Sequence, residues 1–401
     1  MNNNKNILVV VPYSLSYSFH GNSIRVKNMI NGLRSKGVNV NTIEYDLPWI
    51  RNIAKEYRVK NDIVFLSALS KIVFGFSFYD YYCMISDPVK NFSRKIFRDI
   101  SNKNINVLQI ENLWPLPSIA DNLEKNKPVI ITLHDVYSDR YREVIDYTSR
   151  TPRFLKEKII NKIKEIEAHY LNKANVIVTL TKEDRERYIE LGVEPDKMIV
   201  IPNGINLQEI KPIEANPKIQ KEYRDSENEV ILFFAGSLMY QNKKAIDDVA
   251  KYILPKLVKK IKVKMLVAGT ISKYVVRRKY HRKMPIFPLG YVDNINDFYS
   301  IADIILIPTF LGTGFKTKTL EAMAAGKVVV TNSKSSRGIE ARNWRDIIIC
   351  EDFDCMVDSI IVLKEDKDLA LKIEKNARRI AEKYDWSSIL DKYIRIYEIL
   401  N

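Results

Sequence analysis

The stretch from Gly312 to Gly326 has the residue types and the spacing of a phosphate-binding site. It follows an apolar segment, 303–308, that we expect to be a buried strand, and it leads into a helix that contains alanine and leucine. Glycines let the backbone approach a ligand, and the N-terminus of a helix offers unpaired N–H groups with a partial positive charge. Lys316 and Lys318 add two cations at the same place. The pattern predicts a site for a phosphate-bearing ligand.

Glu321 extends this interpretation from a phosphate to a nucleotide. It follows Lys318 by about one helical turn, so its carboxylate can accept hydrogen bonds from paired hydroxyls such as those of a ribose. Together the two lysines and the glutamate suit a sugar nucleotide. The alternative is a solvated first helical turn that binds nothing, with glycines that serve only the bend.

Composition and charge narrow the class of protein. The chain has 401 residues, of which 46% are hydrophobic, and this is enough for two domains with a core in each. The formal net charge of +15 indicates anionic partners, such as nucleotide phosphates or an acidic membrane surface. Nucleic acid fits poorly, because the basic residues are spread along the chain without a recognition motif. The start of the chain lacks the long apolar segment of a secretory signal, which predicts a cytoplasmic protein.

The cysteines indicate neither a disulfide framework nor a metal site. Cys83, Cys350 and Cys355 are odd in number and lack the spacing of zinc ligands. We therefore expect reduced thiols, and we expect no metal because no other cluster of ligands is visible in the sequence.

Both halves of the chain alternate apolar strand candidates with amphipathic helices. Residues 206–228 are polar and contain two prolines, which is typical of an interdomain connection. The fold class is therefore α/β, with a mostly parallel sheet in each half, helices on both faces, and ligands at the carboxyl ends of the strands. The expected strands are 7–11, 38–45, 107–110, 129–133, 176–180, 198–201, 230–235, 265–268, 286–291, 303–308 and 328–331.

Two helical segments raise the question of a membrane. Residues 63–79 are apolar but are interrupted by Lys71, and this length is marginal for a span, so we expect a buried helix. A helix at 153–172 has an apolar stripe at helical spacing and a basic opposite face with three glutamates. That face either docks peripherally on an anionic membrane or is simply solvated. A further helix is expected to begin at Thr181, with Asp184 placed as in a capping box.

Six segments occur in the order found in glycosyltransferase family 4, and the chain resembles that family over nearly its whole length. The resemblance implies the GT-B fold, which has two Rossmann-like, doubly wound domains facing across a cleft. We accordingly place an acceptor-side domain at 1–205, a nucleotide-sugar-binding domain at 206–383, and at 384–401 a helix that packs back toward the first domain. The six segments are Gly21 with Arg25, His134-Asp135, Val200–Gly204, Ala235-Gly236-Ser237, Leu289–Asp293 and the loop 312–326.

The resemblance also assigns roles to residues. It places His134 and Asp135 at the reacting centre, where an ordinary turn is the alternative. It implies transfer of a sugar from a nucleotide sugar, with retention of anomeric configuration, to a glycan, lipid-linked or protein-linked acceptor. Neither a metal nor a cofactor beyond this substrate is implied. The donor-binding residues would be Gly21, Gly236, Tyr291, Gly312, Thr313, Gly314, Lys316, Lys318 and Glu321.

The chain departs from the family pattern at two places. Thr313 stands where the family often has the first glutamate of a pair whose second member is Glu321, and this leaves the identity of the donor sugar open. Ser237 and Asn242 stand where the family has an arginine and a lysine. We interpret Lys316 and Lys318 as taking over that cationic role.

Other polar residues have structural interpretations. His20 belongs to the first loop, and Arg25 is expected to be a helix-surface or packing residue. Glu167 is expected to order a junction between a helix and a strand, and Glu111 with Trp114 to shape the acceptor side. Two other functions share the fold or the ligand: a nucleotide-sugar 2-epimerase, and a non-catalytic protein that binds sugar nucleotides.

Overall fold

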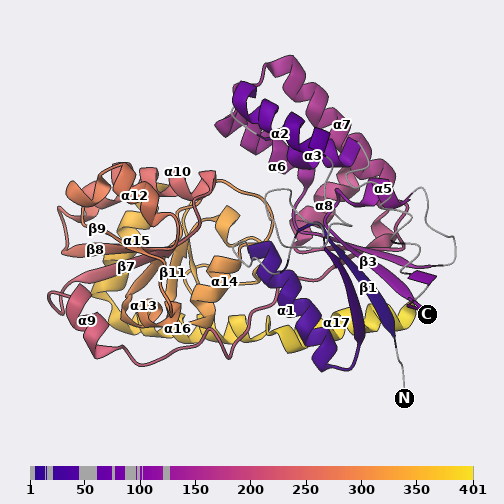
Figure 1. Cartoon of the computed structure of the whole chain (residues 1–401). Coiled ribbons are helices and arrows are strands. Elements are labelled where there is room, and N and C mark those ends of the chain that lie inside the picture. The colour runs from indigo at the N-terminus through magenta and orange to yellow at the C-terminus, as the bar shows by residue number, and fades with distance from the viewer. Residues whose placement is uncertain are drawn as a thin grey trace. The chain divides into compact units, whose positions relative to one another are not determined.

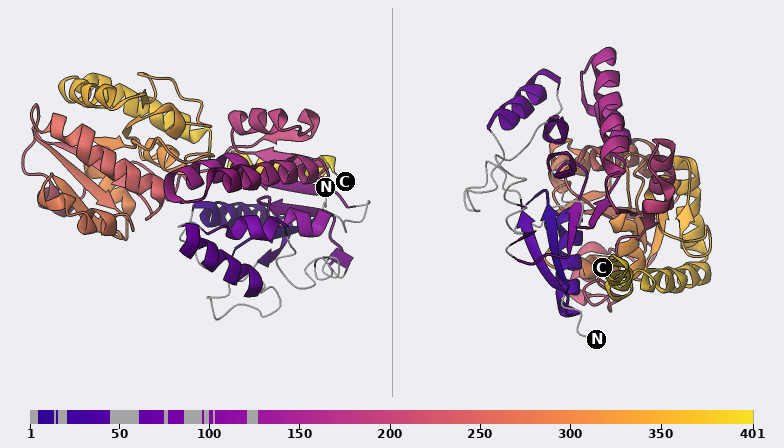
Figure 2. Two further views of the ribbon diagram at one scale, coloured as in Figure 1. Left: turned by 90° about the horizontal axis from the view of Figure 1, so that it is seen from above. Right: turned by 90° about the vertical axis from the view of Figure 1, so that its right-hand side faces the viewer.

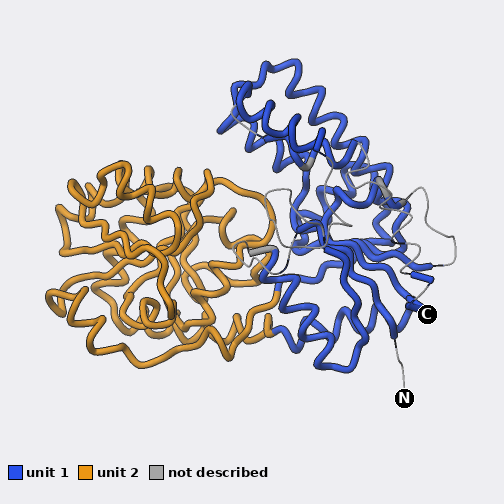
Figure 3. Tube along the Cα trace, in the orientation of Figure 1, with its two compact units in different colours: residues 1–203, 386–401 blue, residues 204–385 orange. Residues whose placement is uncertain are grey.

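The computed structural model describes residues 5–13, 15, 21–44, 61–74, 77–85, 96, 100, 101, 103–120 and 127–400, so His20 lies outside the described residues. The chain divides into two compact units (Figure 3). Unit 1 comprises residues 1–203 and 386–401, and unit 2 comprises residues 204–385. Each unit contains a six-stranded parallel sheet with helices packed against it (Figure 1), which is the GT-B type of α/β fold.

The sheet of unit 1 has the strand order β2-β1-β3-β4-β5-β6. Its strands are rich in valine and isoleucine, and side chains on both faces are buried, as expected of a parallel sheet covered by helices. Because β3 pairs with β4 in parallel, the carboxyl ends of these two strands lie next to each other. The strands are β1 (Asn6–Val11), β2 (Asn39–Glu44), β3 (Val107–Glu111), β4 (Val129–Leu133), β5 (Val176–Thr179) and β6 (Met198–Val200).

Helices cover both faces of this sheet (Figure 2). The apolar stripe expected at 153–172 is confirmed, because Ile159, Ile163 and Ile166 of α7 are buried. The cap expected at Thr181 is also confirmed, because its side chain accepts a hydrogen bond from the Asp184 N–H at 3.0 Å. The described helices of unit 1 are α1 (Gly21–Ser35), α2 (Asn61–Phe74), α3 (Tyr79–Ile85), α5 (Leu116–Ala120), α6 (Tyr137–Thr148), α7 (Arg153–Leu171), α8 (Lys182–Glu190) and α17 (Trp386–Ile399).

Glu167 of α7 orders the junction between β4 and α6, as expected. Its Oε1 accepts the Tyr137 N–H at 2.8 Å and the Ser138 N–H at 3.3 Å, and so replaces the missing side-chain cap of α6. Burial raises the pKa of Glu167 to about 7, although these hydrogen bonds oppose the shift.

The buried helix expected at 63–79 is wrong. Helix α2 ends at Phe74 and α3 begins only at Tyr79. On α2 the buried face includes Ser67 and Ser70, whereas Phe65 and Ile72 are 66% and 82% exposed. Serine can take the inner position because its hydroxyl bonds to the helix itself: Ser67 Oγ donates to the Ile63 carbonyl at 2.6 Å. Among the described helices, none is both long and apolar enough to span a bilayer.

The sheet of unit 2 has the order β12-β11-β10-β7-β8-β9. The two-residue strand β12 was not expected, because so short a segment carries no alternation. The strands are β7 (Val230–Ala235), β8 (Val263–Ala268), β9 (Ile286–Gly290), β10 (Ile304–Leu306), β11 (Val328–Thr331) and β12 (Ile348–Ile349). The α-helices are α9 (Pro217–Tyr223), α10 (Tyr240–Asp248), α11 (Leu254–Leu257), α12 (Ser272–Arg277), α13 (Ile295–Ile301), α14 (Thr317–Ala324), α15 (Phe353–Glu365) and α16 (Lys367–Glu382).

Residues 206–228 are not a connection between the units, and that expectation is corrected. They belong to unit 2 and include helix α9. Arg224 fixes the end of this segment, because its guanidinium donates to the Ile301 carbonyl at 2.9 Å and forms an ion pair with Asp303 at 3.0 Å. The segment is held to unit 2 by these side-chain contacts and by partly buried apolar residues such as Ile210 and Ile219, which pack on the core.

The expectation of reduced thiols is wrong for two of the three cysteines. Cys350, which follows β12, and Cys355, in the first turn of α15, form a disulfide with a Cα–Cα distance of 5.5 Å. The chain turns back between them, and this brings the Cα atoms into the range that a disulfide requires. Cys83 is free and buried.

Candidate active site

His134 lies directly after β4 in a buried cluster of polar side chains in unit 1. Its Nε2 is 2.8 Å from Oε2 of Glu111, the last residue of β3. Arg25 of α1 places Nη1 3.0 Å from the same Glu111 oxygen. The neighbouring strand ends explain why Glu111 and His134 meet, and α1 adds the cation. Arg25 is therefore a buried packing residue, and its alternative placement on the helix surface is wrong.

The C-terminal helix α17 completes this cluster. Arg25 Nη2 donates to the Tyr393 hydroxyl at 2.7 Å. Gln109 Nε2 donates to Glu111 Oε1 at 2.7 Å, and the Tyr397 hydroxyl donates to Gln109 Oε1. Both oxygens of Glu111 thus have hydrogen-bond donors, and a residue more than 350 positions away in the sequence holds Arg25 in place. The sequence did not predict that Tyr393 and Tyr397 bond to this cluster, because their spacing on α17 indicates only an apolar stripe.

The cluster sets the protonation of His134. Burial lowers the pKa of His134, and the hydrogen bond that its ring donates to Glu111 only partly opposes this. Burial raises the pKa of Glu111, but Arg25 and His134 together hold it below its ordinary value. The neutral imidazole therefore donates from Nε2 to the ionised carboxylate and keeps a lone pair on Nδ1. Among the described residues, this buried Nδ1 has no hydrogen-bond partner.

Asp135 lies beside His134 in the sequence but contacts other groups. Its Oδ2 is 3.7 Å from Arg140 Nη1, and its carbonyl accepts a hydrogen bond from the Tyr188 hydroxyl at 2.9 Å. These contacts hold the turn that carries His134. Gly21, the remaining predicted site residue of unit 1, is the first residue of α1.

In unit 2, three glycines bring the carboxyl ends of β7, β8 and β9 together. The Gly236 N–H donates to the Ala268 carbonyl at 3.0 Å, and the Gly269 N–H donates to the Gly290 carbonyl at 2.6 Å. Gly269 has a φ of +88°, and a Cβ atom there would lie 2.4 Å from the Gly236 oxygen, so only glycine fits. Tyr291 follows directly and is 81% exposed. Gly269 was missed by sequence reasoning, although it ends a strand as Gly236 does.

The loop predicted to bind the donor, here called the donor loop, contains Gly312, Thr313 and Gly314 and leads from β10 to α14. Gly312 and Gly314 have φ values of +100° and +69°, which explains the need for glycine at both positions. Lys316 Nζ donates to the Thr313 carbonyl at 2.8 Å, and a Cβ atom on Gly312 would lie 3.0 Å from that Nζ. Lys316 is the N-cap residue of α14 and makes no side-chain cap bond. The loop thus holds its first lysine against the helix N-terminus.

Lys318 contacts one of the positions at which the chain departs from the family pattern. Its Nζ donates to Asn242 Oδ1 at 2.7 Å and lies 4.5 Å from the centroid of the Phe234 ring. Asn242 in turn donates to the Ser237 carbonyl at 2.8 Å. The ammonium group of Lys318 therefore lies beside the position where the family has a lysine.

Burial moves the pKa values of Lys318 and Glu321 toward neutral pH. It lowers the pKa of Lys318 to about 7, and Lys316 contributes in the same direction. It raises the pKa of Glu321 to about 7, although Lys318 opposes the shift. All three side chains remain partly exposed. A bound phosphate would favour the charged form of Lys318, so the loop is suited to an anion.

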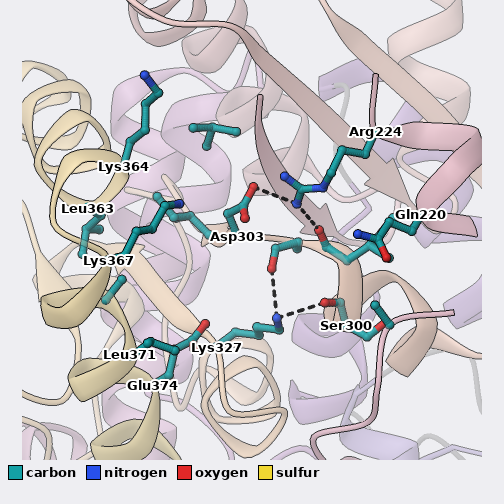
Figure 4. Close-up of a pocket in the computed structure, with 16 residues that line it drawn as sticks. Gln220, Arg224, Ser300, Asp303, Lys327, Leu363, Lys364, Lys367, Leu371 and Glu374 are labelled. Carbon is teal, nitrogen blue, oxygen red and sulfur yellow. Dashed lines mark hydrogen bonds and ion pairs between the residues drawn. The ribbon is translucent and has the colours of Figure 1, made fainter. Parts of the chain in front are cut away.

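A separate hollow of about 270 Å³ lies at the opposite edge of the unit 2 sheet, before the amino ends of β7, β10 and β11 (Figure 4). Several of its polar groups are bonded within the protein: Lys327 Nζ donates to the carbonyls of Ser300 and Ala302 at 3.1 and 3.0 Å, and Arg224 pairs with Asp303. Ligands of parallel α/β sheets bind at the carboxyl ends of the strands, and this is where Gly236 and the donor loop lie. Among the described residues, no group of three or more His, Cys, Asp or Glu side chains is arranged to hold a metal ion.

Two family models match the chain. The model for Glycosyltransferase Family 4 matches residues 21–209, and the model for Glycosyl transferases group 1 matches residues 229–366. The first matched segment contains Arg25, Glu111 and His134, and the second contains the loop that begins at Gly312. The chain belongs to this family of GT-B glycosyltransferases.

Two relatives with named activities are similar to this chain at about one quarter sequence identity. The UDP-Gal:alpha-D-GlcNAc-diphosphoundecaprenol alpha-1,3-galactosyltransferase of Escherichia coli is 25% identical over 55% of this chain and 59% of its own length. The N,N'-diacetylbacillosaminyl-diphospho-undecaprenol alpha-1,3-N-acetylgalactosaminyltransferase of Campylobacter jejuni is 24% identical over 60% of this chain and 64% of its own length. The chain thus spans less than two thirds of either relative.

A solved structure shows the same fold along the whole chain. Sucrose-phosphate synthase from Thermosynechococcus elongatus superposes with a TM-score of 0.72 and covers 99% of each chain, at 13% sequence identity.

Proposed function

We propose that the protein is a retaining glycosyltransferase that moves a sugar from a nucleotide sugar to a lipid-linked acceptor. The observation that carries this proposal is the donor loop, where Lys316, Lys318 and the N-terminus of α14 meet at the carboxyl edge of a parallel sheet. These groups suit a diphosphate. The exposed ring of Tyr291 is available to stack on the base, and Glu321 to accept hydrogen bonds from the ribose.

The same groups favour departure of the nucleotide. When the bond between the sugar and the diphosphate breaks, negative charge grows on the leaving oxygen. The ammonium groups of Lys316 and Lys318 and the helix N-terminus offset that charge. The leaving phosphate then accepts the proton of the acceptor hydroxyl on the same face of the sugar, so the anomeric configuration is retained.

We assign His134 to the sugar at the reacting centre. Its neutral ring has an Nδ1 lone pair without a partner among the described residues, and this lone pair can accept a hydrogen bond from a hydroxyl group of the donor sugar. Glu111 and Arg25 fix the ring and its tautomer, so the acceptor atom is oriented before the sugar binds. Asp135 supports the turn through Arg140.

The lipid-linked acceptor is supported by the names of the two relatives, both of which act on diphosphoundecaprenol-linked sugars. We propose an acceptor of this class for the present chain, with the reaction at the inner face of the membrane. Thr313 replaces a family glutamate beside the donor sugar, so we leave the sugar itself unassigned.

The test is to incubate the protein with UDP-, GDP-, TDP-, ADP- and CMP-sugars, with and without a polyprenyl-diphosphate sugar. We expect release of the free nucleotide only in the presence of the acceptor, a product with the anomeric configuration of the donor by proton NMR, and no effect of EDTA on the rate. Release of nucleotide without an acceptor would instead indicate an epimerase-like reaction. An inverted product would overturn the mechanism, and binding without turnover would leave a non-catalytic protein.

A further inference from the structure

Helix α2 presents large apolar side chains to solvent along one side. They recur at helical spacing, so they form a single stripe over its last three turns. The opposite side, which carries Ile63, Ser67 and Ser70, is buried, and α2 packs on α3. We call the exposed stripe the outer face of α2, and its residues are Phe65, Leu66, Leu69, Ile72 and Val73.

In a helix that only packs on a core, the large apolar side chains are buried and the polar ones are exposed, but in α2 two serines are buried and five large apolar side chains are exposed. The buried serines bond to backbone within the same segment: Ser70 Oγ donates to the Ser67 carbonyl at 2.9 Å and accepts the Phe78 N–H at 3.1 Å. The inner side therefore needs little apolar surface, whereas the outer face exposes five large apolar side chains to water. A contiguous exposed apolar patch of this kind marks an interaction surface.

A basic rim adjoins the C-terminal end of the outer face. The Arg150 N–H donates to the Phe74 carbonyl at 2.8 Å, which joins the α6–α7 connection to the end of α2. Phe154, four residues after Arg150 at the start of α7, is 76% exposed. Arg150, Arg153 and Lys158 are exposed, and within the described part of the chain they form no ion pairs.

The nearby acidic groups are already neutralised. Asp146 pairs with Lys156, and Glu157 pairs with Arg142. The exposed Asp62 lies at the other end of α2, before the apolar stripe begins. The rim thus keeps a positive excess beside the apolar face. Further along α7, Lys162 pairs with Glu165, so only the start of that helix contributes to the rim.

We propose that the outer face of α2, together with Phe154 and the basic rim, docks on the surface of an anionic bilayer. A helix of 14 residues is too short to span a bilayer, but its apolar side can enter the boundary between headgroups and acyl chains while the rim cations meet anionic headgroups. The choice of a bilayer over a protein partner rests on the lipid-linked acceptor of the proposed function. The exposure of the face does not depend on it.

Sedimentation of the full chain with vesicles tests the proposal. We expect binding to vesicles of phosphatidylcholine with about one third phosphatidylglycerol, and weaker binding to phosphatidylcholine alone. The double variant Phe65→Ser/Ile72→Ser should lower binding to both by at least about tenfold, because it removes apolar area that would enter the boundary. Arg150→Gln/Arg153→Gln should remove most of the preference for the anionic vesicles and its salt dependence.

The control variant is Val276→Ser/Leu371→Ser, which changes two half-exposed apolar residues of unit 2 and should bind vesicles like the unchanged protein. Depth is measured with Ile72→Trp, whose fluorescence should be quenched by brominated lipid, in comparison with Val276→Trp, which should not be quenched. Absence of vesicle binding, or an unquenched Ile72→Trp, would overturn the proposal. The proposal would also be overturned if the protein formed a dimer in vesicle-free buffer and Ile72→Ser abolished that dimer, because the outer face of α2 would then bind a second copy of the chain.

The test is separate from that of the proposed function. Phe65→Ser/Ile72→Ser should leave nucleotide affinity and transfer to a water-soluble acceptor unchanged, and loss of either would overturn the assignment of α2 to docking alone. Vesicle binding without any sugar transfer would refute the proposed function and leave the docking surface in place.

Discussion

The cluster around His134 and the loop around Lys318 both place charged groups at the carboxyl ends of parallel strands, but they differ in how those charges are balanced. In the cluster, Glu111 has donors on both oxygens, and its partner Arg25 is held by Tyr393. In the loop, Lys318 has a neutral amide as its partner and a second lysine nearby, and its pKa falls to about 7. The charges of the first site are balanced without a ligand, whereas those of the second would become balanced when an anion binds.

This comparison predicts that the His134 cluster contributes to stability and the loop contributes to binding. The largest expected effect is that of Glu111→Ala, which leaves the buried guanidinium of Arg25 without its counter-charge. We expect a loss of about 3–5 kcal/mol in the free energy of unfolding of unit 1, measured by urea denaturation. Glu321→Ala, the matched change in the loop, should cost far less, and equal losses would show that the two sites do not differ in this way.

The pH dependence of the Glu111 contribution has a definite sign. Its pKa is lower in the folded protein than in the unfolded chain, so its stabilisation is present above the unfolded value and is lost as pH falls through the folded value. The difference in stability between the unchanged protein and Glu111→Gln should therefore shrink on acidification. A difference that grows toward low pH would contradict the ion pair with Arg25.

His134→Ala should separate rate from binding. If Nδ1 contacts the sugar chiefly in the transition state, turnover should fall by about 100-fold or more while the nucleotide dissociation constant stays nearly constant. Steady-state kinetics and calorimetric titration with the nucleoside diphosphate measure the two quantities. Normal turnover would remove His134 from the reacting centre.

Lys316→Ala and Lys318→Ala, unlike His134→Ala, should weaken nucleotide binding itself. Each change removes a charge-assisted bond to phosphate and should weaken nucleotide affinity by about 1.5–3 kcal/mol, which is roughly 10- to 150-fold. The urea midpoint should change far less than in Glu111→Ala, because Lys316 donates to a backbone carbonyl and Lys318 donates to a neutral amide. Unchanged affinity in the folded double variant would disprove the phosphate assignment.

The loop should also show a smaller dependence on pH. Lys318 is neutral above its pKa of about 7 in the free protein, and phosphate must recharge it, so affinity should fall by up to about tenfold per pH unit above 7. Glu321 acts in the opposite direction, because it ionises as pH rises. The titration is therefore best made in Glu321→Gln, with Lys318→Arg in the same background as the control, since arginine stays charged and should abolish the dependence. A dependence that persists with arginine would assign it to another group.

The smallest expected effect concerns the ribose. Glu321→Gln should weaken binding of a ribonucleotide by about 0.5–1.5 kcal/mol and that of the matching 2′-deoxyribonucleotide by less, because the carboxylate is proposed to accept from both hydroxyls. Parallel calorimetric titrations compare the two ligands. Equal losses would mean that Glu321 serves only the helix.

Local patterns in the sequence were enough to predict the parallel α/β architecture and the strand, turn and helix around Gly312. Strands such as 129–133 and 230–235 are short apolar runs bounded by polar residues, and burial on both faces of a parallel sheet requires such runs. The loop residues from Gly312 to Glu321 are close in sequence, so a turn and one helical turn place them together whatever the rest of the fold does. Short-range geometry is the reason that these features could be predicted.

Tertiary structure decided the rest. Arg25, Glu111, His134 and Tyr393 come from four separate segments, and only strand order and the packing of α17 bring them together. The inverted orientation of α2 also depends on its neighbours, because helical spacing shows that a helix has two different sides but not which side is buried. Serines that bond to their own helix could occupy the inner side, so the apolar residues were left facing outward. These outcomes depend on contacts between residues far apart in the chain, and a periodic pattern in one segment carries no information about them.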